Sequence, residues 1–168
     1  ENYTQLLWFF EGFTSYYDDL LLRRAGLIDD ATYLKLITKT INQVLQTPGR
    51  QVQTVAQASF DAWVKYYRQD ENTPNATVSY YTKGSLVALC LDLHLRQHGK
   101  ATLDDVMRGL WSRCKAGPMS EADLLTVLEE LTDPEIPVIS LRELGILRDV
   151  RPAADGLEVV ITPTYSGC

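Results

Sequence analysis

The spacing of the apolar residues changes once along this chain of 168 residues, and the change divides it into two kinds of structure. Up to about residue 114, apolar side chains recur every three or four positions, which is the period of a helix that packs on one face. Together with the Gly and Pro stops, this spacing predicts five helices. They cover about residues 3–25, 30–47, 59–67, 79–98 and 103–114, with a loop over D-E-N-T-P-N at 70–75.

A different pattern starts at Ser120. A sixth helix is expected over 120–131, because Ser120 can cap it, acidic residues follow in its first turn, and Asp133-Pro134 ends it. Three short β-branched runs come next, at 138–141, 146–150 and 157–162, and the last two predict a hairpin. The predicted fold is therefore mainly α, with a helical subdomain followed by a small, incomplete α+β tail.

The composition divides at nearly the same place. Residues 1–118 hold 13 basic and 12 acidic side chains and 15 of the 16 aromatic ones, whereas residues 119–168 hold 3 basic and 10 acidic. We therefore predict two segments of different origin, 1–118 and 119–168, with 120–131 as a shared or junction helix. The chain opens with Glu1 rather than Met and stops directly after an apolar-to-turn segment, so we expect a piece of a longer protein.

Several classes of function are disfavoured by composition. The net charge of -6 and the scattered Lys and Arg argue against nucleic-acid binding, and no apolar run approaches the roughly 20 residues that span a bilayer. Three cysteines without C-x-x-C spacing argue against a disulfide framework, which favours a reducing compartment such as the cytoplasm.

One acidic residue stands among aromatic rings near the start of the chain. Glu11 is the only charged residue between Gln5 and Asp18, within L-W-F-F-E-G-F-T-S-Y-Y. A carboxylate in apolar surroundings needs a hydrogen bond, a countercharge or a cation, because an unpaired buried charge is costly. A metal ion is the sharpest hypothesis for the partner of Glu11.

Three segments resemble one peptidase family in order and spacing: W-F-F-E-G-F-T-S-Y-Y-D-D-L, S-F-D-A-W-V-K-Y-Y-R-Q-D-E-N-T-P-N and S-Y-Y-T-K-G-S-L-V-A-L-C-L-D-L. They are similar to the C-terminal half of the catalytic domain of the glycyl aminopeptidases, zinc metallopeptidases of the gluzincin type, over about residues 1–116. The resemblance implies that Glu11 is the third zinc ligand, after two histidines of an upstream H-E-x-x-H helix. Three protein ligands leave the fourth zinc position for a water whose pKa falls to about 7. Thr14, Ser15 and Asp18 lie within two helical turns of Glu11 and are candidates to support it.

The segment Tyr81-Thr82-Lys83-Gly84 is similar to the Y-x-K-G motif of related aminopeptidases. The resemblance implies that the Tyr81 hydroxyl donates a hydrogen bond to the oxyanion of the tetrahedral intermediate. Without the resemblance, Tyr80 and Tyr81 read as aromatic residues packed at a helix start. Lys83 is either a structural residue or an electrostatic neighbour, and the sequence leaves that open.

The sequence departs from the family pattern in one respect, since it contains no H-E-x-x-H. Its two histidines, His94 and His98, have the spacing of that motif, but Leu95 stands where the motif needs Glu, and both follow the Tyr81 motif. Solvent-facing histidines near a helix C-terminus are the better interpretation. In the intact peptidase we expect zinc, and peptide substrates with an N-terminal Gly or Ala. For this chain alone we predict neither zinc binding nor cleavage.

The tail carries a second resemblance. D-P-E-I-P-V-I-S-L-R-E-L-G-I-L-R-D-V, followed by V-V-I-T-P-T-Y-S-G-C, is similar to the start of PaaD-like proteins, a family linked to iron-sulfur assembly and phenylacetyl-CoA oxygenase maturation. The resemblance implies a reactive or metal-associated thiol at Cys168, motif roles for Asp133 and Glu135, and an oxygenase or iron-sulfur assembly partner. Turn chemistry around Pro134 and Pro137 explains the two acidic residues equally well. The alternative function is therefore a PaaD-like maturation module, joined to the peptidase part within the helix at 120–131.

Overall fold

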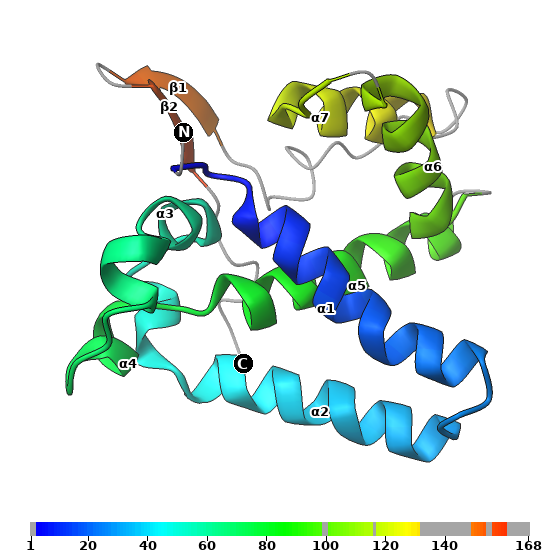
Figure 1. The fold of residues 1–168 in the computed structure, drawn as a ribbon, viewed down its shortest axis with the longest axis horizontal. Coiled ribbons are helices and arrows are strands. Elements are labelled where there is room, and N and C mark those ends of the chain that lie inside the picture. Colours follow the sequence, from blue (N-terminus) through cyan, green and yellow to red (C-terminus); the bar gives the residue numbers. More distant parts are fainter. Residues whose placement is uncertain (1–2, 99–100, 116, 132–148, 154–155, 161–168) are drawn as a thin grey trace. The chain divides into compact units, whose positions relative to one another are not determined.

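The computed structural model describes residues 3–98, 101–115, 117–131, 149–153 and 156–160, and the chain divides into two compact units, 1–97 and 98–168. The first unit contains α1 (Leu7–Arg24), α2 (Asp30–Gln46), α3 (Val55–Phe60), α4 (Thr73–Ala76) and α5 (Tyr80–His98) (Figure 1). The second contains α6 (Leu103–Cys114), α7 (Glu121–Glu130), β1 (Asp149–Ala153) and β2 (Gly156–Val160). The prediction of a mainly α fold is confirmed.

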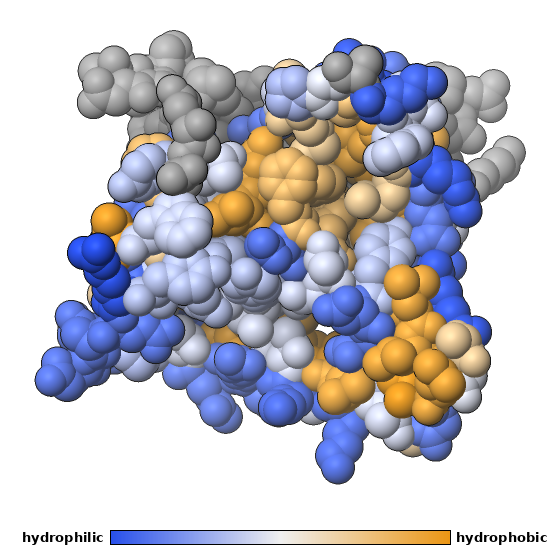
Figure 2. Space-filling model, in the orientation of Figure 1, coloured by the Kyte–Doolittle hydropathy of each residue, from blue (hydrophilic) through white to orange (hydrophobic). Residues whose placement is uncertain are grey.

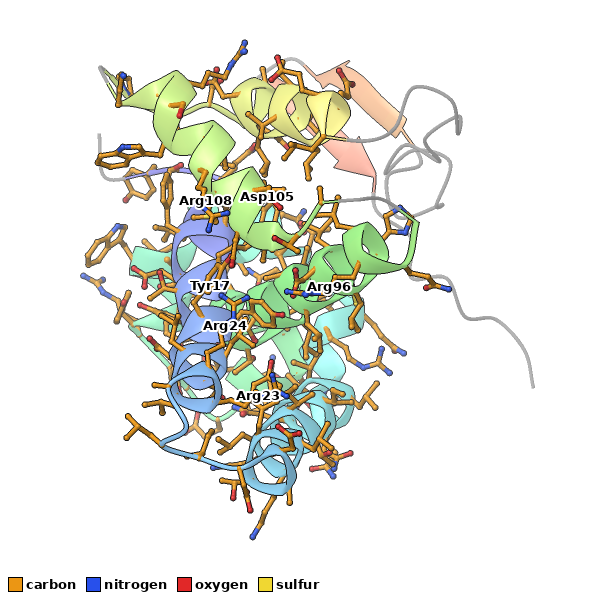
Figure 3. All side chains as sticks on the ribbon, turned by 90° about the vertical axis from the view of Figure 1, so that its right-hand side faces the viewer. Tyr17, Arg23, Arg24, Arg96, Asp105 and Arg108 are labelled. Carbon is orange, nitrogen blue, oxygen red and sulfur yellow. The ribbon has the colours of Figure 1, made fainter. Side chains whose placement is uncertain are left out.

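The turn between α1 and α2 has the expected signals. Gly26 adopts a φ of +72°, a left-handed conformation that stops α1 and that glycine tolerates best. Asp29 caps α2 by accepting the Thr32 N–H at 2.8 Å. Across the turn the Arg23 side chain, labelled in Figure 3, donates to the Asp30 carboxylate at 2.7 Å. These contacts fold α2 back alongside α1.

The third predicted helix has a different form in the structure. It begins earlier, at Val55, because Thr54 and Gln57 form a reciprocal capping box at its start. After Phe60 the α-helical hydrogen bonding ends, and a π-helical turn covers Ala62–Tyr66. A short 3-10 turn at Pro48–Gln51 and the four-residue α4 fill segments that the sequence predicts as loop.

The core of the first unit lies where α1, α3 and α5 meet. Phe9, Phe13, Tyr16 and Leu20 of α1 are buried, and the Trp8 N–H donates to the buried Ser59 hydroxyl of α3 at 2.9 Å. A neighbouring cluster of buried side chains holds the start of α5 against α3 and the π-helical turn. Its members are Ala58, Ala62, Val78 and Tyr80.

Several leucines near the turn between α1 and α2 remain exposed. Figure 2 shows an apolar surface at this end of the first unit, to which Leu21, Leu22, Leu27 and Leu34 belong. Helix α1 is thus buried along one face only.

The second unit contains a helical hairpin and a strand hairpin. Helices α6 and α7 pack against each other, and the Arg113 side chain of α6 donates to the Asp123 carboxylate of α7 at 3.0 Å. Strands β1 and β2 pair antiparallel, with Asp149 opposite Val160 and Ala153 opposite Gly156. The predicted hairpin is therefore present, and the described part of its first strand covers Asp149–Ala153. The predicted strand at 138–141 lies outside the described residues.

Candidate active site

The two peptidase-like motifs meet where α1 crosses α5. A methyl group added to Gly12 of α1 would lie 2.5 Å from the Cα of Gly84 of α5, and one added to Gly84 would meet the Trp8 carbonyl oxygen and the Cα of Gly12. Only two glycines allow backbones to approach this closely. The crossing therefore brings the neighbours of these glycines, Glu11 and the Tyr81 turn, to the same place (Figure 1).

Glu11 is half-buried and lies close enough to act on two phenols. Its negative charge helps to raise the pKa of Tyr81, behind the larger effects of a hydrogen bond with Tyr67 and of burial, to about 12. Hydrogen bonds with Tyr80 and then with Tyr81 lower the Tyr67 pKa, and burial and the charge of Glu11 oppose that effect. Glu11, Tyr67 and Tyr81 thus share one electrostatic environment.

The Tyr81 ring is held by other aromatic rings. It stacks on Tyr80 with centroids 4.7 Å apart and planes 30° apart, and it lies against Tyr66 at 5.8 Å and 34°. Tyr81 also packs on the core cluster that contains Ala58 and Val78. Its hydroxyl is therefore carried on a fixed ring at the edge of the core, as an oxyanion donor requires.

The three residues predicted to support Glu11 lie along the same helix. Thr14 and Asp18 are exposed and Ser15 is half-buried. The Thr14 hydroxyl donates to the Phe10 carbonyl oxygen of its own helix at 2.7 Å. Within the described part of the chain no hydrogen bond joins Glu11 to these side chains, and their supporting role stays a prediction.

Lys83, whose role the sequence leaves open, joins α5 to a neighbouring segment by a hydrogen bond. Its ammonium group donates to the Arg50 carbonyl oxygen at 3.2 Å. Burial, and then the charge of Arg50, lower the Lys83 pKa. The lysine of the Y-x-K-G motif therefore anchors the helix that carries Tyr81.

Two residues near this site were not singled out by the sequence. Tyr67 lies in the quoted W-V-K-Y-Y-R segment and contacts Tyr81, with their hydroxyl oxygens 3.5 Å apart. Asp92 of α5 is buried and accepts hydrogen bonds from Tyr16 of α1 at 2.7 Å and from Arg96 at 2.9 Å. The quoted motif contains Tyr67 but does not indicate how its side chain is oriented, and an isolated Asp in a helix offered no signal for Asp92.

The described residues do not supply a complete metal site. Among them, no three His, Cys, Asp or Glu side chains come together in a way that could hold a metal ion. Glu11 alone would give one carboxylate oxygen donor, which suits zinc but does not suffice for it. His94 is partly buried on α5. The tail positions Asp133, Glu135 and Cys168 lie outside the described residues.

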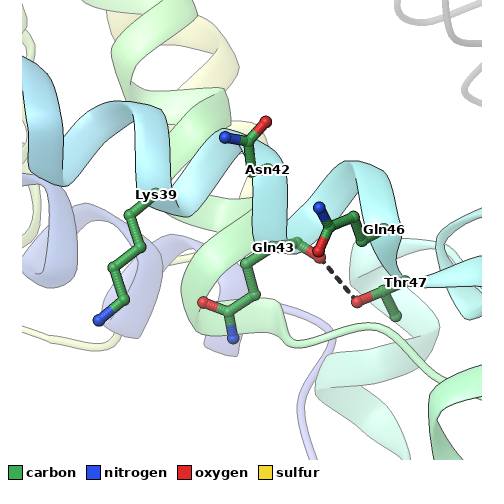
Figure 4. Close-up of a pocket in the computed structure, with 5 residues that line it drawn as sticks. All are labelled: Lys39, Asn42, Gln43, Gln46 and Thr47. Atoms are coloured by element: carbon green, nitrogen blue, oxygen red, sulfur yellow. Dashed lines mark hydrogen bonds between the residues drawn. The ribbon is translucent and has the colours of Figure 1, made fainter.

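A surface hollow lies away from these motifs. It is lined by polar side chains of α2 and the residue after it, namely Lys39, Asn42, Gln43, Gln46 and Thr47 (Figure 4). The Thr47 hydroxyl donates to the Gln43 carbonyl oxygen at 2.8 Å. None of the residues that the sequence nominates for chemistry lines it.

Comparison with known proteins decides the family of the larger part. Residues 1–87 match the M61 glycyl aminopeptidase family. The chain belongs to this family. A crystal structure of an aminopeptidase N family protein from Idiomarina loihiensis matches 81% of the chain, with a TM-score of 0.75 and 44% identity. The M61 chain spans 24% of that protein.

The tail matches a second family. Residues 121–168 match a family described as iron-sulfur cluster assembly protein. A protein of Escherichia coli (strain K12), whose name describes it as one component of a 1,2-phenylacetyl-CoA epoxidase, is 39% identical over 51 residues, which are 30% of this chain and 31% of the relative. Both resemblances seen in the sequence are thus confirmed: part of an M61 peptidase is joined to the start of a PaaD-like domain. Of the helices described, none is long and apolar enough to cross a membrane.

Proposed function

We propose that the M61 part of this chain supplies one carboxylate and one phenol to the active site of a zinc aminopeptidase that removes N-terminal Gly or Ala. Glu11 would be a zinc ligand and Tyr81 the donor to the oxyanion. The observation that carries the proposal is the close backbone approach of Gly12 and Gly84, which brings Glu11 and the turn that holds Tyr81 to the same crossing. The M61 family match and the aminopeptidase N relative support the same assignment.

The roles follow from ordinary chemistry of these groups. Zinc, when bound, acts as a Lewis acid and activates a water near neutral pH. Glu11 offers a carboxylate oxygen for such an ion from a helix whose position the glycine contact fixes. With its pKa raised to about 12, Tyr81 keeps its proton at neutral pH and can donate it in a hydrogen bond to a developing oxyanion.

The chain alone would lack this activity, because its sequence holds no H-E-x-x-H and its described residues form no three-ligand group. The test joins the chain to the upstream part of an M61 relative that carries H-E-x-x-H. We expect bound zinc, measured by mass spectrometry, and hydrolysis of glycine and alanine p-nitroanilides. The chain by itself would do neither.

Two substitutions in the joined protein separate the roles. Glu11→Gln would abolish stoichiometric zinc, whereas Tyr81→Phe would keep zinc and lower kcat by about 100-fold or more. Glu71→Gln is the matched control, since Glu71 is exposed in a loop of the same unit. A Glu11→Gln protein with full zinc content and full activity would contradict the proposal.

A second function is proposed for the tail. Its iron-sulfur assembly family match and its E. coli relative support a maturation module that handles iron or a cluster, or contacts an oxygenase component, through Cys168. Iron binding by the whole chain, followed by absorbance and iron analysis, would then be lost in Cys168→Ser. Cys90→Ser is the control, because Cys90 is an exposed free thiol. Equal iron binding by the two variants would exclude this role. The free thiols of Cys90 and Cys114 are consistent with the proposed cytoplasmic location.

A further inference from the structure

Tyr67 is placed beside the candidate site by the π-helical turn that precedes it. Its backbone N–H bonds to the Ala62 carbonyl oxygen at 3.0 Å, five residues back instead of the α-helical four. Such wide turns recur at functional sites because they redirect the side chains that follow. The Tyr67 ring then stacks on Trp63, with centroids 5.2 Å apart and planes 26° apart. The residue as a whole is 55% exposed.

The Tyr67 hydroxyl joins two neighbouring phenols. The Tyr80 hydroxyl donates to it at 3.4 Å, and the hydroxyl oxygens of Tyr67 and Tyr81 lie 3.5 Å apart, a distance at which either can donate. Tyr80 is 1% exposed, so it has to direct its proton to a protein acceptor. The three hydroxyl groups therefore form a chain from the core, through Tyr67, to Tyr81.

These contacts point to a function beyond packing. We propose that Tyr67 is a positioning residue, whose hydroxyl holds the Tyr81 phenol oxygen at the place from which it donates to the substrate oxyanion. This inference rests on the proposed peptidase function of Tyr81. It assigns to Tyr67 no contact with the substrate.

The hydrogen-bond chain explains how the Tyr67 hydroxyl can hold the Tyr81 oxygen both before and during the reaction. Because Tyr67 accepts a hydrogen bond from Tyr80, its own O–H is available to donate to the oxygen of Tyr81. Before substrate binds, Tyr81 can donate to Tyr67. When Tyr81 turns its proton to an oxyanion, Tyr67 donates to Tyr81 instead, so the phenol oxygen stays in place. Hydrogen bonds of this length in a free enzyme shorten in the reacting complex.

Kinetics of the joined protein test the inference. Tyr67→Phe keeps the ring stacked on Trp63 and removes the hydroxyl, and we expect kcat to fall about tenfold with KM unchanged. In a Tyr81→Phe background the same substitution would change kcat less than about twofold, because its effect passes through Tyr81. Tyr66→Phe is the matched control: its ring lies in the same cluster, and its hydroxyl makes no hydrogen bond with another described residue. That variant would retain wild-type kcat.

The unmodified chain gives a second readout that needs neither zinc nor activity. With tyrosines labelled by carbon-13 at Cζ, the Tyr81 signal would move in Tyr67→Phe and stay in place in Tyr66→Phe. An unmoved Tyr81 signal, or equal kcat losses from Tyr67→Phe with and without Tyr81, would overturn the inference alone. Wild-type activity of Tyr81→Phe would overturn the proposed function together with this inference.

Discussion

At the scale of single residues, the site depends on two glycines, whose lack of a Cβ atom lets two helices approach each other closely. Gly12 follows the candidate ligand Glu11, and Gly84 ends the motif that begins with Tyr81. Each glycine contacts backbone atoms of the opposite helix. A glycine inside a helix costs stability of the isolated helix, about 1 kcal/mol relative to alanine, and here the cost is offset by the close approach that it permits.

Gly12→Ala tests that contact. The added methyl carbon would lie 2.5 Å from the Gly84 Cα and 3.0 Å from the Ser85 nitrogen. Backbone atoms cannot move aside as a flexible side chain can, so we expect a loss of about 3 kcal/mol in the free energy of unfolding in urea. The control is Gly117→Ala, where nothing lies within 4 Å, and a change below about 1 kcal/mol is expected there. Equal stability of the two variants would show that α1 and α5 are not in contact at Gly12.

The sequence predicted some of the site residues for physical reasons that can be stated. The family motifs nominated Glu11 and Tyr81 directly. Tyr67 could not be assigned a role, because its orientation depends on a π-helical turn that leaves no mark in a 3.6-residue periodicity. Lys83 was undecided because its partner is a backbone carbonyl, at Arg50, which no side-chain pattern encodes.

At the scale of elements, a buried carboxylate links α1 to α5 beyond the glycine crossing. Asp92 is 3% exposed and accepts hydrogen bonds from Tyr16 and Arg96 on the same oxygen. Burial, and then the hydrogen bond and charge of Asp92, raise the Tyr16 pKa, so Tyr16 remains a donor at neutral pH. The hydrogen bonds from Tyr16 and Arg96 thus help to compensate the buried charge of Asp92.

Asp92→Ala would remove the carboxylate that accepts from the buried Tyr16 hydroxyl and open a space between the helices. We expect the free energy of unfolding to fall by about 3 kcal/mol. Asp30→Ala removes an exposed carboxylate bound to Arg23 and should leave the free energy of unfolding nearly unchanged, because solvent screens such a pair. Urea unfolding followed by circular dichroism measures both. Similar losses in the two variants would contradict a structural role for the buried network.

The capping residues at the start of α7 predict how the stability of the fold depends on pH. Ser120 and Asp123 form a reciprocal capping box, and hydrogen bonds from the Ser120 side chain and backbone, followed by one from Arg113, lower the Asp123 pKa to about 2. A carboxylate whose folded pKa is depressed stabilises the fold above its unfolded pKa of about 3.8. That contribution is therefore present at neutral pH and is lost as the pH falls from about 4 to about 2.

A carbon-13 titration of the Asp123 carboxyl group would check this. Ser120→Ala should raise its pKa more than Arg113→Ala does, because the cap supplies the larger effects. The opposite order would show that the ion pair with Arg113, rather than the cap, holds the carboxylate. This capping pattern is visible in the sequence, which is why the start of α7 was predicted to within one residue. By contrast, α3 starts four residues before its predicted start at residue 59, directly after Thr54, which forms a capping box with Gln57.

At the scale of the whole molecule, the family matches and the compact units divide the chain differently. The M61 match ends at residue 87 and the iron-sulfur assembly match starts at 121, whereas the units separate between 97 and 98. Helix α7 lies within the iron-sulfur assembly match, whereas α6 lies outside both family matches. The two helices nevertheless pack closely, since a methyl group added to Gly109 of α6 would lie 2.7 Å from the Val127 side chain of α7. The predicted boundary at 118/119 stays a prediction. A helix at 121–130 that packs well on α6 is compatible with a junction inside it.

If the two units fold independently, a cavity in one should leave the other unaffected. Val127 of α7 and Val55 of α3 form a matched pair, since both are buried valines, 2% and 4% exposed, in different units. Each Val→Ala change should cost about 2 kcal/mol by loss of two methyl groups. Amide hydrogen exchange would then show faster opening of α6 and α7 in Val127→Ala, with α1 and α5 unchanged, and the reverse in Val55→Ala. If either variant instead accelerates exchange in all of these helices, the chain unfolds as a single cooperative unit. The M61 part and the PaaD-like part would then belong to one folding domain.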